Sequence, residues 1–329
     1  MKNLSAGILS SFAGIIREAT VLFLRLLKIM VPVIILVKII TELDLLPYLA
    51  DLLEPVMHLM GLPGSMGLVW ATAILNNVYS AMIVFVSLPG SFELSVAQVT
   101  ILSTAVLMAH ALPIELRIAQ KCGARLVFQA LFRIICAIIL GIILNLVYEW
   151  GGWLQGQNTV VWRPDPQPEG LMGWFAAQLR NLGVIYLIIM ALVAVIRFLD
   201  YIQVTRILIW MLNPLFRLLG IGREAASITI VGLTMGLAYG GALIIREVRT
   251  RRIPQRDVFF SLTLMGIAHS LIEDTLLMLL LGADLSGILL ARLVFSLVCV
   301  FLLYKIWAYL PAKYVHRYLH PLDASEVKT

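Results

Sequence analysis

The chain has 329 residues with a net charge of +6; 61% of its residues are hydrophobic and only 13% are charged. Its mean hydropathy is +0.96. So little polar surface excludes a soluble globule of this size, and we expect an all-α polytopic membrane protein in contact with the lipid bilayer. The excess positive charge falls mainly in loops, so no nucleic-acid partner is expected.

In chain order, residues 1–17 are less apolar than a span and are expected to form an amphipathic helix on the inner membrane surface. Apolar runs near the spanning length of about 20 residues come next. They lie at 18–41, 64–88, 97–118, 124–148, 174–199, 224–245, 258–281 and 286–310. Two shorter segments, 45–60 and 203–219, could span, re-enter or lie at the interface.

One unit of the chain is used twice. Positions that differ by 159 match without a gap, as His110 does with His269, and Arg133 with Arg292. A period far above the solenoid range of about 20 to 50 residues indicates duplicated halves. The sequence predicts a first repeat at 18–150, an outer linker at 151–171, a second repeat at 172–311 and a cytoplasmic tail at 312–329.

Loop charges predict that the two repeats have opposite orientations, because cytoplasmic loops collect Lys and Arg. Loop 246–256 holds five Arg, whereas its counterpart 87–97 holds no Lys or Arg. Loop 117–125 is basic, whereas its counterpart 281–285 holds only an Asp. Inversion needs an odd number of crossings per half. We therefore expect two inverted repeats of about five helices, ten membrane segments in all, in the cell membrane with both termini cytoplasmic.

The two short segments are interrupted by proline and end at glycine in both halves. Pro55 and Gly61 stand in the first, and Pro214 and Gly220 in the second. Secondary transporters use discontinuous elements near the bilayer midplane, so these four residues are predicted gating positions. The alternative is that a proline and a glycine simply close a short helix.

Ionisable residues inside apolar spans are costly and form the predicted coupling site. His110 and Glu115 in the first half match His269 and Asp274 in the second, and Glu273 lies one turn from His269. An imidazole beside a carboxylate can exchange a proton near neutral pH, so H⁺ or Na⁺ coupling is predicted. The alternative is a set of hydrogen bonds that fastens the two halves.

Two further cations lie deep within predicted helices. Arg133 and Arg292 either snorkel or pair with Glu115 and Asp274, and we expect pairing across the repeat. If they faced an open cavity instead, an anionic substrate would follow. The three cysteines have no metal-binding spacing, so the sequence predicts no metal and no resident cofactor.

The third helix of each half supplies the predicted substrate contacts. A stripe of Gly232, Gly236 and Gly240 indicates close helix packing, and Asn77 interrupts its counterpart. The amide and hydroxyl groups around this point suit a base, a sugar or another polar ligand. The predicted binding residues are Asn76, Asn77, Tyr79, Ser80, Thr234 and Tyr239. The alternative for Asn77 is that its side chain satisfies a neighbouring broken backbone.

The stretch Gly61–Ser65, the run 68–85 and the repeated Ala-His-x-Leu at 109–112 and 268–271 resemble the "nucleoside recognition" or Gate-domain membrane proteins. That family is distantly similar to concentrative nucleoside transporters, to the membrane part of ferrous iron transporters and to spore maturation membrane proteins. The resemblance covers 35–145 and 195–305 and implies two fused Gate units. The chain has no phosphate-binding loop, which argues against GTP-driven iron uptake.

The sequence therefore predicts a secondary transporter of a small polar metabolite, nucleoside-like or an organic anion, in which the halves alternate access around a midplane site. A homo-oligomer is compatible with the glycine stripe. The alternative is a structural or assembly protein whose polar pairs only fasten the halves. An intramembrane enzyme is not expected, since no His-Glu-x-x-His motif is present.

Overall fold

A computed structural model describes residues 2–43, 45–88, 90–160, 170–249, 253–309 and 311. Within these ranges the chain is helical, with one isolated bridge between Ser95 and Gln157. Residues 161–169 of the predicted linker and the predicted tail 312–329 lie outside the described residues.

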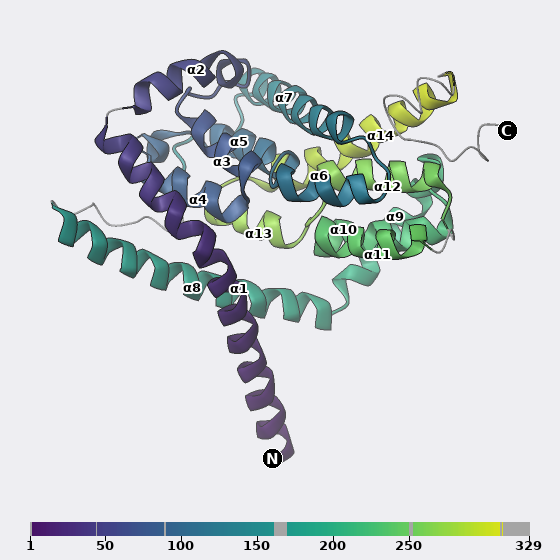
Figure 1. The fold of residues 1–329 in the computed structure, drawn as a ribbon, viewed down its shortest axis with the longest axis horizontal. Coiled ribbons are helices and arrows are strands. Elements are labelled where there is room, and N and C mark those ends of the chain that lie inside the picture. The colour runs from purple at the N-terminus through teal and green to yellow at the C-terminus, as the bar shows by residue number, and fades with distance from the viewer. Residues whose placement is uncertain are drawn as a thin grey trace.

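Fourteen α-helices are described within these ranges (Figure 1). The first half contains α1 (Lys2–Glu42), α2 (Leu46–Leu59), α3 (Met66–Leu75), α4 (Val78–Ser87), a short 3₁₀ turn (Ser91–Glu93), α5 (Val96–Met108), α6 (Leu112–Lys121) and α7 (Leu126–Gly151). The second contains α8 (Leu171–Tyr201), α9 (Val204–Leu218), α10 (Arg223–Met235), α11 (Leu237–Arg249), α12 (Gln255–Ala268), α13 (Glu273–Leu280), a π-helical turn (Ser286–Ala291) and α14 (Arg292–Tyr309).

The helix boundaries repeat at the 159-residue spacing, so α1 to α7 correspond to α8 to α14. The unusual backbone angles repeat as well. Gly61 and Gly220 both have φ 70°, and Ala111 and Ser270 both have φ 50°. Non-glycine residues rarely adopt this left-handed conformation, so its recurrence at equivalent positions shows that the two halves share a local fold.

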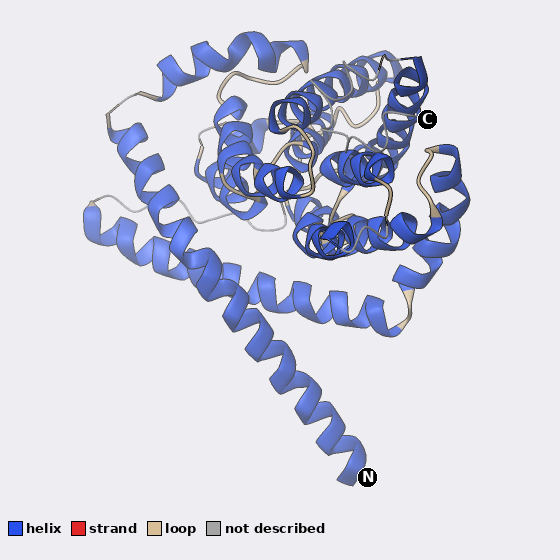
Figure 2. Ribbon diagram, turned by 45° about the vertical axis from the view of Figure 1, so that its right-hand side comes forward, coloured by secondary structure: helices blue, strands red, loops and turns tan. Residues whose placement is uncertain are grey.

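The long helices α1 and α8 cross on one side of the bundle, as Figures 1 and 2 show. Apolar side chains fill the crossing, and Thr20 contacts the Tyr186 hydroxyl at 2.9 Å. Helix α1 is continuous from Lys2, so the predicted boundary at residue 17 is absent. Residues 2–31 contain no proline to end the helix there.

The prediction of continuous helices over 64–88 and 224–245 is wrong. Each run forms two short helices that fold back and pack on each other, α3 on α4 and α10 on α11. At the second hairpin a Cβ on Gly240 would stand 2.5 Å from the Gly232 Cα, so the two backbones touch. Equivalent positions in the first hairpin hold buried alanines, Ala73 and Ala81.

The predicted helices over 97–118 and 258–281 are also broken, between α5 and α6 and between α12 and α13. These pairs do not fold back. Together they form two 26-residue segments, Val96–Lys121 and Gln255–Leu280, that are long enough to cross a membrane. The breaks are centred on Ala111 and Ser270, whose left-handed backbone ends the helical path.

The short helices do not break at their prolines. Pro55 lies inside α2 and Pro214 inside α9, and each helix ends only before the left-handed glycine, Gly61 or Gly220. A helix of 14 residues is about 21 Å long, which is shorter than a hydrocarbon core of about 30 Å. The sequence therefore placed the discontinuities in the wrong helices.

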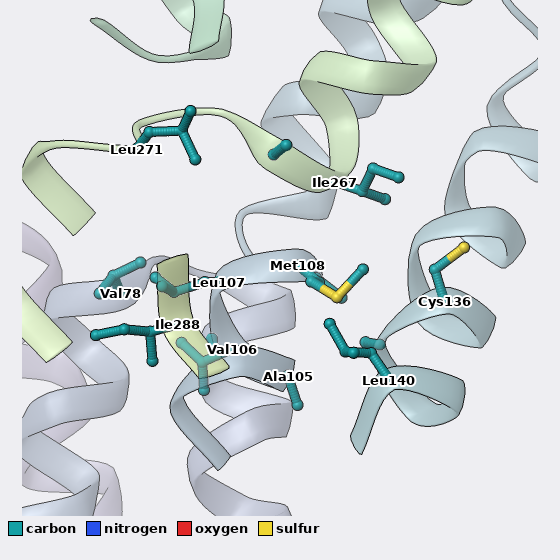
Figure 3. Close-up of a cluster of buried hydrophobic side chains, with 14 of the residues drawn as sticks. Val78, Ala105, Val106, Leu107, Met108, Cys136, Leu140, Ile267, Leu271 and Ile288 are labelled. Carbon is teal, nitrogen blue, oxygen red and sulfur yellow. The ribbon is translucent and has the colours of Figure 1, made fainter. Parts of the chain in front are cut away.

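In the described part of the chain, six segments are long and apolar enough to cross a membrane: α1, α5–α6, α7, α8, α12–α13 and α14. The broken segments are the most buried and form the centre, while α1 and α8 are the least buried. Figure 3 shows Met108 and Ile267, the equivalent last turns of α5 and α12, in one apolar cluster with Cys136 and Leu140.

Candidate ion and substrate site between the halves

The two predicted histidines meet at the point where the halves are related. The Nε2 atoms of His110 and His269 lie 3.0 Å apart, and both side chains are buried. His269 directly follows the last residue of α12, and His110 lies two residues beyond the last residue of α5, so both stand at a helix break. The two histidines are equivalent in the repeat, so their contact lies where equivalent positions of the two halves meet. We call the groups around this contact the axial cluster: His110, Glu115, His269 and Asp274, with Arg133 and Arg292.

Backbone carbonyls fix the tautomer of both rings. His110 Nδ1 lies 3.0 Å from the Val106 carbonyl oxygen, and His269 Nδ1 lies 2.8 Å from that of Met265. A carbonyl oxygen only accepts, so each Nδ1 must carry a hydrogen and donate it. Both Nε2 lone pairs therefore point into the space that the two rings share.

Glu115 joins the cluster through both of its oxygens. Its Oε2 accepts from the Arg133 guanidinium at 2.5 Å, while Oε1 lies 3.0 Å from His269 Nε2 and 3.8 Å from His110 Nε2. Arg133 also donates to the carbonyls of Met108 and His110. The ion pair lies within the first half, whereas the sequence predicted pairing across the repeat.

The equivalent pair in the second half is not formed. Arg292 donates to the carbonyls of Ile267, His269 and, across the halves, Leu107. Its Nη1 has no hydrogen-bond partner, and neither has Asp274 Oδ2, which instead lies 3.6 Å from His110 Nε2. Aspartate is one methylene shorter than the glutamate at position 115, which explains why it does not reach the arginine.

The tip of the first hairpin contains the predicted amide residues, and they bond to one another. Asn77 Oδ1 accepts from the Ser80 backbone N–H at 2.9 Å and caps α4, and Asn76 Nδ2 donates to the Ser80 hydroxyl at 3.0 Å. This is the role that the sequence analysis left as the alternative for Asn77. At the end of the hairpin, the Ser80 side chain is buried, and those of Asn76 and Asn77 are half-buried.

Tyr79 connects the first hairpin to the second half by a hydrogen bond. Its hydroxyl donates to Glu273 Oε1 at 3.0 Å, and Glu273 is the first residue of α13 after the helix break. A predicted substrate residue and a predicted coupling residue are therefore in direct contact. A movement of the hairpin would change the surroundings of the break directly.

The remaining predicted substrate residues are not brought to this contact. The Thr234 hydroxyl bonds back to the carbonyls of Ile230 and Val231 in its own helix. Tyr239 lies in α11, and its side chain is outside the described structure. Pro55 and Pro214, predicted to gate the site, are exposed on α2 and α9.

The glycines that end these short helices serve close packing. A Cβ on Gly61 would meet the Asn145 side chain, and one on Gly220 would meet Tyr304 and Arg256. Both positions therefore need glycine for space as well as for their left-handed backbone. No part of either glycine contact belongs to the axial cluster.

Backbone hydrogen bonds fasten each hairpin to the neighbouring break. The Ala111 N–H donates to the Ala73 carbonyl, and the Leu271 N–H donates to the Leu233 carbonyl. The carbonyls in the last turn of a helix lack partners within that helix, so each break satisfies one from a hairpin. Hairpin tip and helix break thus form one polar unit in each half.

Sequence reasoning missed two contacts that support this region. Gln129 Nε2 donates to the Thr263 hydroxyl of the other half at 2.9 Å, and both groups are buried. The Trp70 indole donates to the Ala105 carbonyl and ties α3 to α5. A glutamine within a strongly apolar run was the available signal for the first, and nothing in the sequence indicated the second.

A cavity of about 260 Å³ lies between α1, α2, α3 and α4. Its walls are mainly apolar, with Thr41, Thr72 and Asn76 as the polar exceptions. The tip of the hairpin is therefore reached from the side that α1 and α2 cover.

Apolar helices long enough to span a bilayer, with buried ionisable side chains at breaks in the central ones, define a polytopic integral membrane protein. The chain is 30% identical over 285 residues to the uncharacterized membrane protein YvoD of Bacillus subtilis (strain 168), covering 85% of this chain and 89% of YvoD. It belongs to the same family as YvoD. No protein-family model and no solved structure matches it.

Proposed function

We propose that this protein is a secondary transporter of a small polar solute, nucleoside-like or an organic anion, coupled to a cation that the axial cluster binds. The observation that carries the proposal is the contact between hairpin tips, helix breaks and buried ionisable groups at the junction of the halves. Transporters bind solutes and ions at discontinuous helices near the midplane between inverted repeats. The resemblance to Gate-domain proteins points the same way.

The proposed topology has three crossings per half instead of five. In the first half α1, α5–α6 and α7 would cross, α3–α4 would re-enter, and α2 would lie on the outer surface; α8 to α14 would repeat this in reverse. Three is odd, so the halves are inverted and both termini are cytoplasmic. Every basic loop then lies inside, as the positive-inside rule requires.

The equivalent short helices support this orientation through their charges. Helix α2 carries Asp51 and Glu54, whereas α9 carries Arg206 and Arg217. Both have an apolar face and are too short to span, which suits helices at the interface. The basic one would then face the anionic inner leaflet.

In the proposed mechanism Asn76, Asn77 and Ser80 would exchange their mutual hydrogen bonds for bonds to the solute. These groups now satisfy one another, so an incoming ligand replaces internal bonds without leaving a buried donor unpaired. The hydrogen bond between Tyr79 and Glu273 would transmit the movement of the hairpin to the helix break in the second half. The two halves would then rock about the axial cluster.

Thermal shift of the detergent-purified protein against nucleosides, nucleobases and organic anions tests the proposal, followed by uptake of any stabilising solute into proteoliposomes. Asn77→Ser retains a capping oxygen for α4 while it removes the carboxamide, so it should fold normally and lose the shift. Asn77→Ala, which loses the cap as well, should cost about 1 kcal/mol of stability besides.

A structural or assembly role is the competing function, and the internally satisfied hairpin tip is the observation that favours it. It predicts that no solute shifts the unfolding temperature and that Asn77→Ser behaves like the parent in every assay. Uptake that Asn77→Ser abolishes would reject it.

A further inference from the structure

We infer that the axial cluster is a binding site for one divalent first-row transition-metal ion, held by His110, His269, Asp274 and Glu115. This deepens the proposed function, because it names the class of ion at the cluster, but it can be tested without any transported solute. The sequence predicted no metal because its cysteines have no metal-binding spacing, and the four donors proposed here lie at or just after two helix breaks that are 159 residues apart in the chain.

The facing histidines need a cation between them. Each Nδ1 carries a hydrogen that it donates to a carbonyl, so both Nε2 atoms present lone pairs at a separation of 3.0 Å. Two lone pairs at that distance repel unless a proton or a metal ion lies between them. Metal-bound histidines almost always donate the other ring N–H to a carbonyl or a carboxylate, as both do here.

The number and spacing of the donors favour a metal ion over a single proton. One donor atom each from His110, His269 and Asp274 lies within 4.8 Å of the others. Glu115 Oε1 is 3.0 and 3.8 Å from the two Nε2 atoms, and Asp274 Oδ2 is 3.6 Å from that of His110. Ligands about 2.0–2.1 Å from a tetrahedral zinc ion stand about 3.3 Å apart, and these separations bracket that value.

The unpaired groups point to the same ion. Asp274 is 7% exposed, and its Oδ2 has no hydrogen-bond partner, although it faces His110 Nε2. Glu115 commits Oε2 to Arg133 and leaves Oε1 for the shared space. A bound metal ion would give Asp274 Oδ2 the partner that the protein does not supply, and it would take Glu115 Oε1 together with His269 Nε2 as ligands.

The local charge also favours a cation. Two arginines, Arg133 and Arg292, stand against three carboxyl groups, those of Glu115, Glu273 and Asp274. With neutral histidines and ionised carboxylates, the axial cluster together with Glu273 carries one net negative charge, which is costly inside a membrane. Two imidazole donors select a transition metal such as zinc, since Mg²⁺ and Ca²⁺ prefer oxygen ligands alone.

The test uses the full chain, purified in detergent with a tag that contains no histidine. Metal content is measured after chelation, reloading with Zn²⁺ and removal of free ion, and again with Co²⁺, whose visible absorption reports coordination geometry. We expect about one ion per chain and a tetrahedral Co²⁺ spectrum with nitrogen and oxygen ligands.

Three variants make the result specific. Asp274→Asn and His269→Gln should each lower the affinity at least about tenfold, since losing even a supporting group of a metal site costs about 10- to 100-fold. Glu54→Gln removes an exposed carboxylate of α2 that is not a proposed ligand, and it should bind the metal within a few-fold of the parent. Unchanged circular dichroism and monodisperse elution would show that each variant is folded.

Two results would overturn the inference: no retained metal in the folded parent, which would leave a shared proton between the rings, or equal retention in the parent, Asp274→Asn and His269→Gln, which would mean adventitious surface binding. Stoichiometric metal without any solute uptake would reject the proposed transport and keep the site. Solute uptake by chelated, metal-free protein would reject metal coupling of transport, while the metal stoichiometry alone decides whether the site exists.

Discussion

Asp274 occupies the position in the second half that Glu115 occupies in the first, yet only Glu115 reaches its arginine. Glu115 Oε2 lies 2.5 Å from Arg133, whereas Asp274 Oδ2 and Arg292 Nη1 both lack a hydrogen-bond partner. One methylene therefore separates a closed ion pair from an open one. The two halves have an arginine and a carboxylate at equivalent positions, but only the first half forms the ion pair.

This asymmetry predicts unequal costs for the two isosteric amide substitutions in chelated protein. Glu115→Gln leaves the buried Arg133 charge unpaired and should destabilise by about 3 to 5 kcal/mol. Asp274→Asn breaks no ion pair with an arginine, so it should cost less than about 1 kcal/mol. Thermal unfolding followed by tryptophan fluorescence in detergent measures both.

The double variant Glu115→Gln with Arg133→Met serves as the control, because it removes both charges and should recover most of the loss. Equal destabilisation by Glu115→Gln and Asp274→Asn would contradict the described asymmetry.

The second hairpin predicts a steric effect at Gly240. A Cβ there would stand 2.5 Å from the Gly232 Cα and 3.0 Å from the Gly232 backbone nitrogen, and backbone cannot move aside as a side chain can. Gly240→Ala should therefore destabilise by about 1 to 3 kcal/mol. The readout is the midpoint of thermal unfolding in detergent.

Gly183→Ala is the matched control, since a Cβ at that helical glycine would meet nothing within 4 Å. It should be neutral or stabilise by up to about 1 kcal/mol, as alanine has the higher helix propensity. If Gly240→Ala were as harmless as Gly183→Ala, the close contact between α10 and α11 would be wrong.

The cross-half hydrogen bond from Tyr79 to Glu273 predicts a functional effect of one oxygen atom. Tyr79→Phe leaves the Glu273 carboxyl without this donor and should cost about 1 to 3 kcal/mol, since the acceptor is a charged group. If the proposed transport is correct, uptake should fall more than stability alone explains.

Tyr186→Phe is the comparison, because it also removes a hydroxyl contact between the halves, at 2.9 Å from Thr20, but with a neutral partner. Its cost should be about 0.5 to 1.5 kcal/mol with no change in uptake per folded molecule. Identical uptake in the two variants would argue against a role for Tyr79 in coupling the hairpin to the break.

Single cysteines at exposed turns test the proposed topology in intact cells. Glu93→Cys and Leu285→Cys should react with an impermeant maleimide from outside, and Lys121→Cys and Pro254→Cys only after permeabilisation. These four positions are exposed in the structure, whereas Ser91 is fully buried and would label from neither side. Labelling of Glu93→Cys and Pro254→Cys from the same side would reject the inversion.

The native thiol at Cys122 should add little background in that experiment. Burial raises the pKa of the Cys122 thiol to about 12. The thiolate is the nucleophile, so at pH 7 to 8 this residue should react orders of magnitude more slowly than an exposed cysteine, and faster as the pH rises towards 12. Rapid labelling of Cys122 at pH 7 would contradict its burial.

The sequence predicted the membrane class correctly, because that class depends on composition, and the 159-residue spacing of the sequence recurs in the helix boundaries. It also placed His110, His269, Glu115 and Asp274 in one group, because ionisable side chains within apolar runs pair with one another or face a polar cavity. It could not find the breaks at Asn77 and Ala111, since the apolar runs through them are long enough for a single helix. A hydropathy profile reports only how long and how apolar a run is. A helical hairpin and a single membrane-spanning helix can have the same length and the same mean hydropathy.

What only the tertiary structure decided is which groups touch. The sequence by itself determined that equivalent arginines and carboxylates exist in each half, at the same spacing of 159. Whether an ion pair forms depends on whether the carboxylate side chain is long enough to cover the distance that the helix packing sets. The glutamate at position 115 is long enough, and the aspartate at position 274, one methylene shorter, is not. In the same way, the contact of the two histidine rings at 3.0 Å follows from the packing of α5 against α12, which no local pattern encodes.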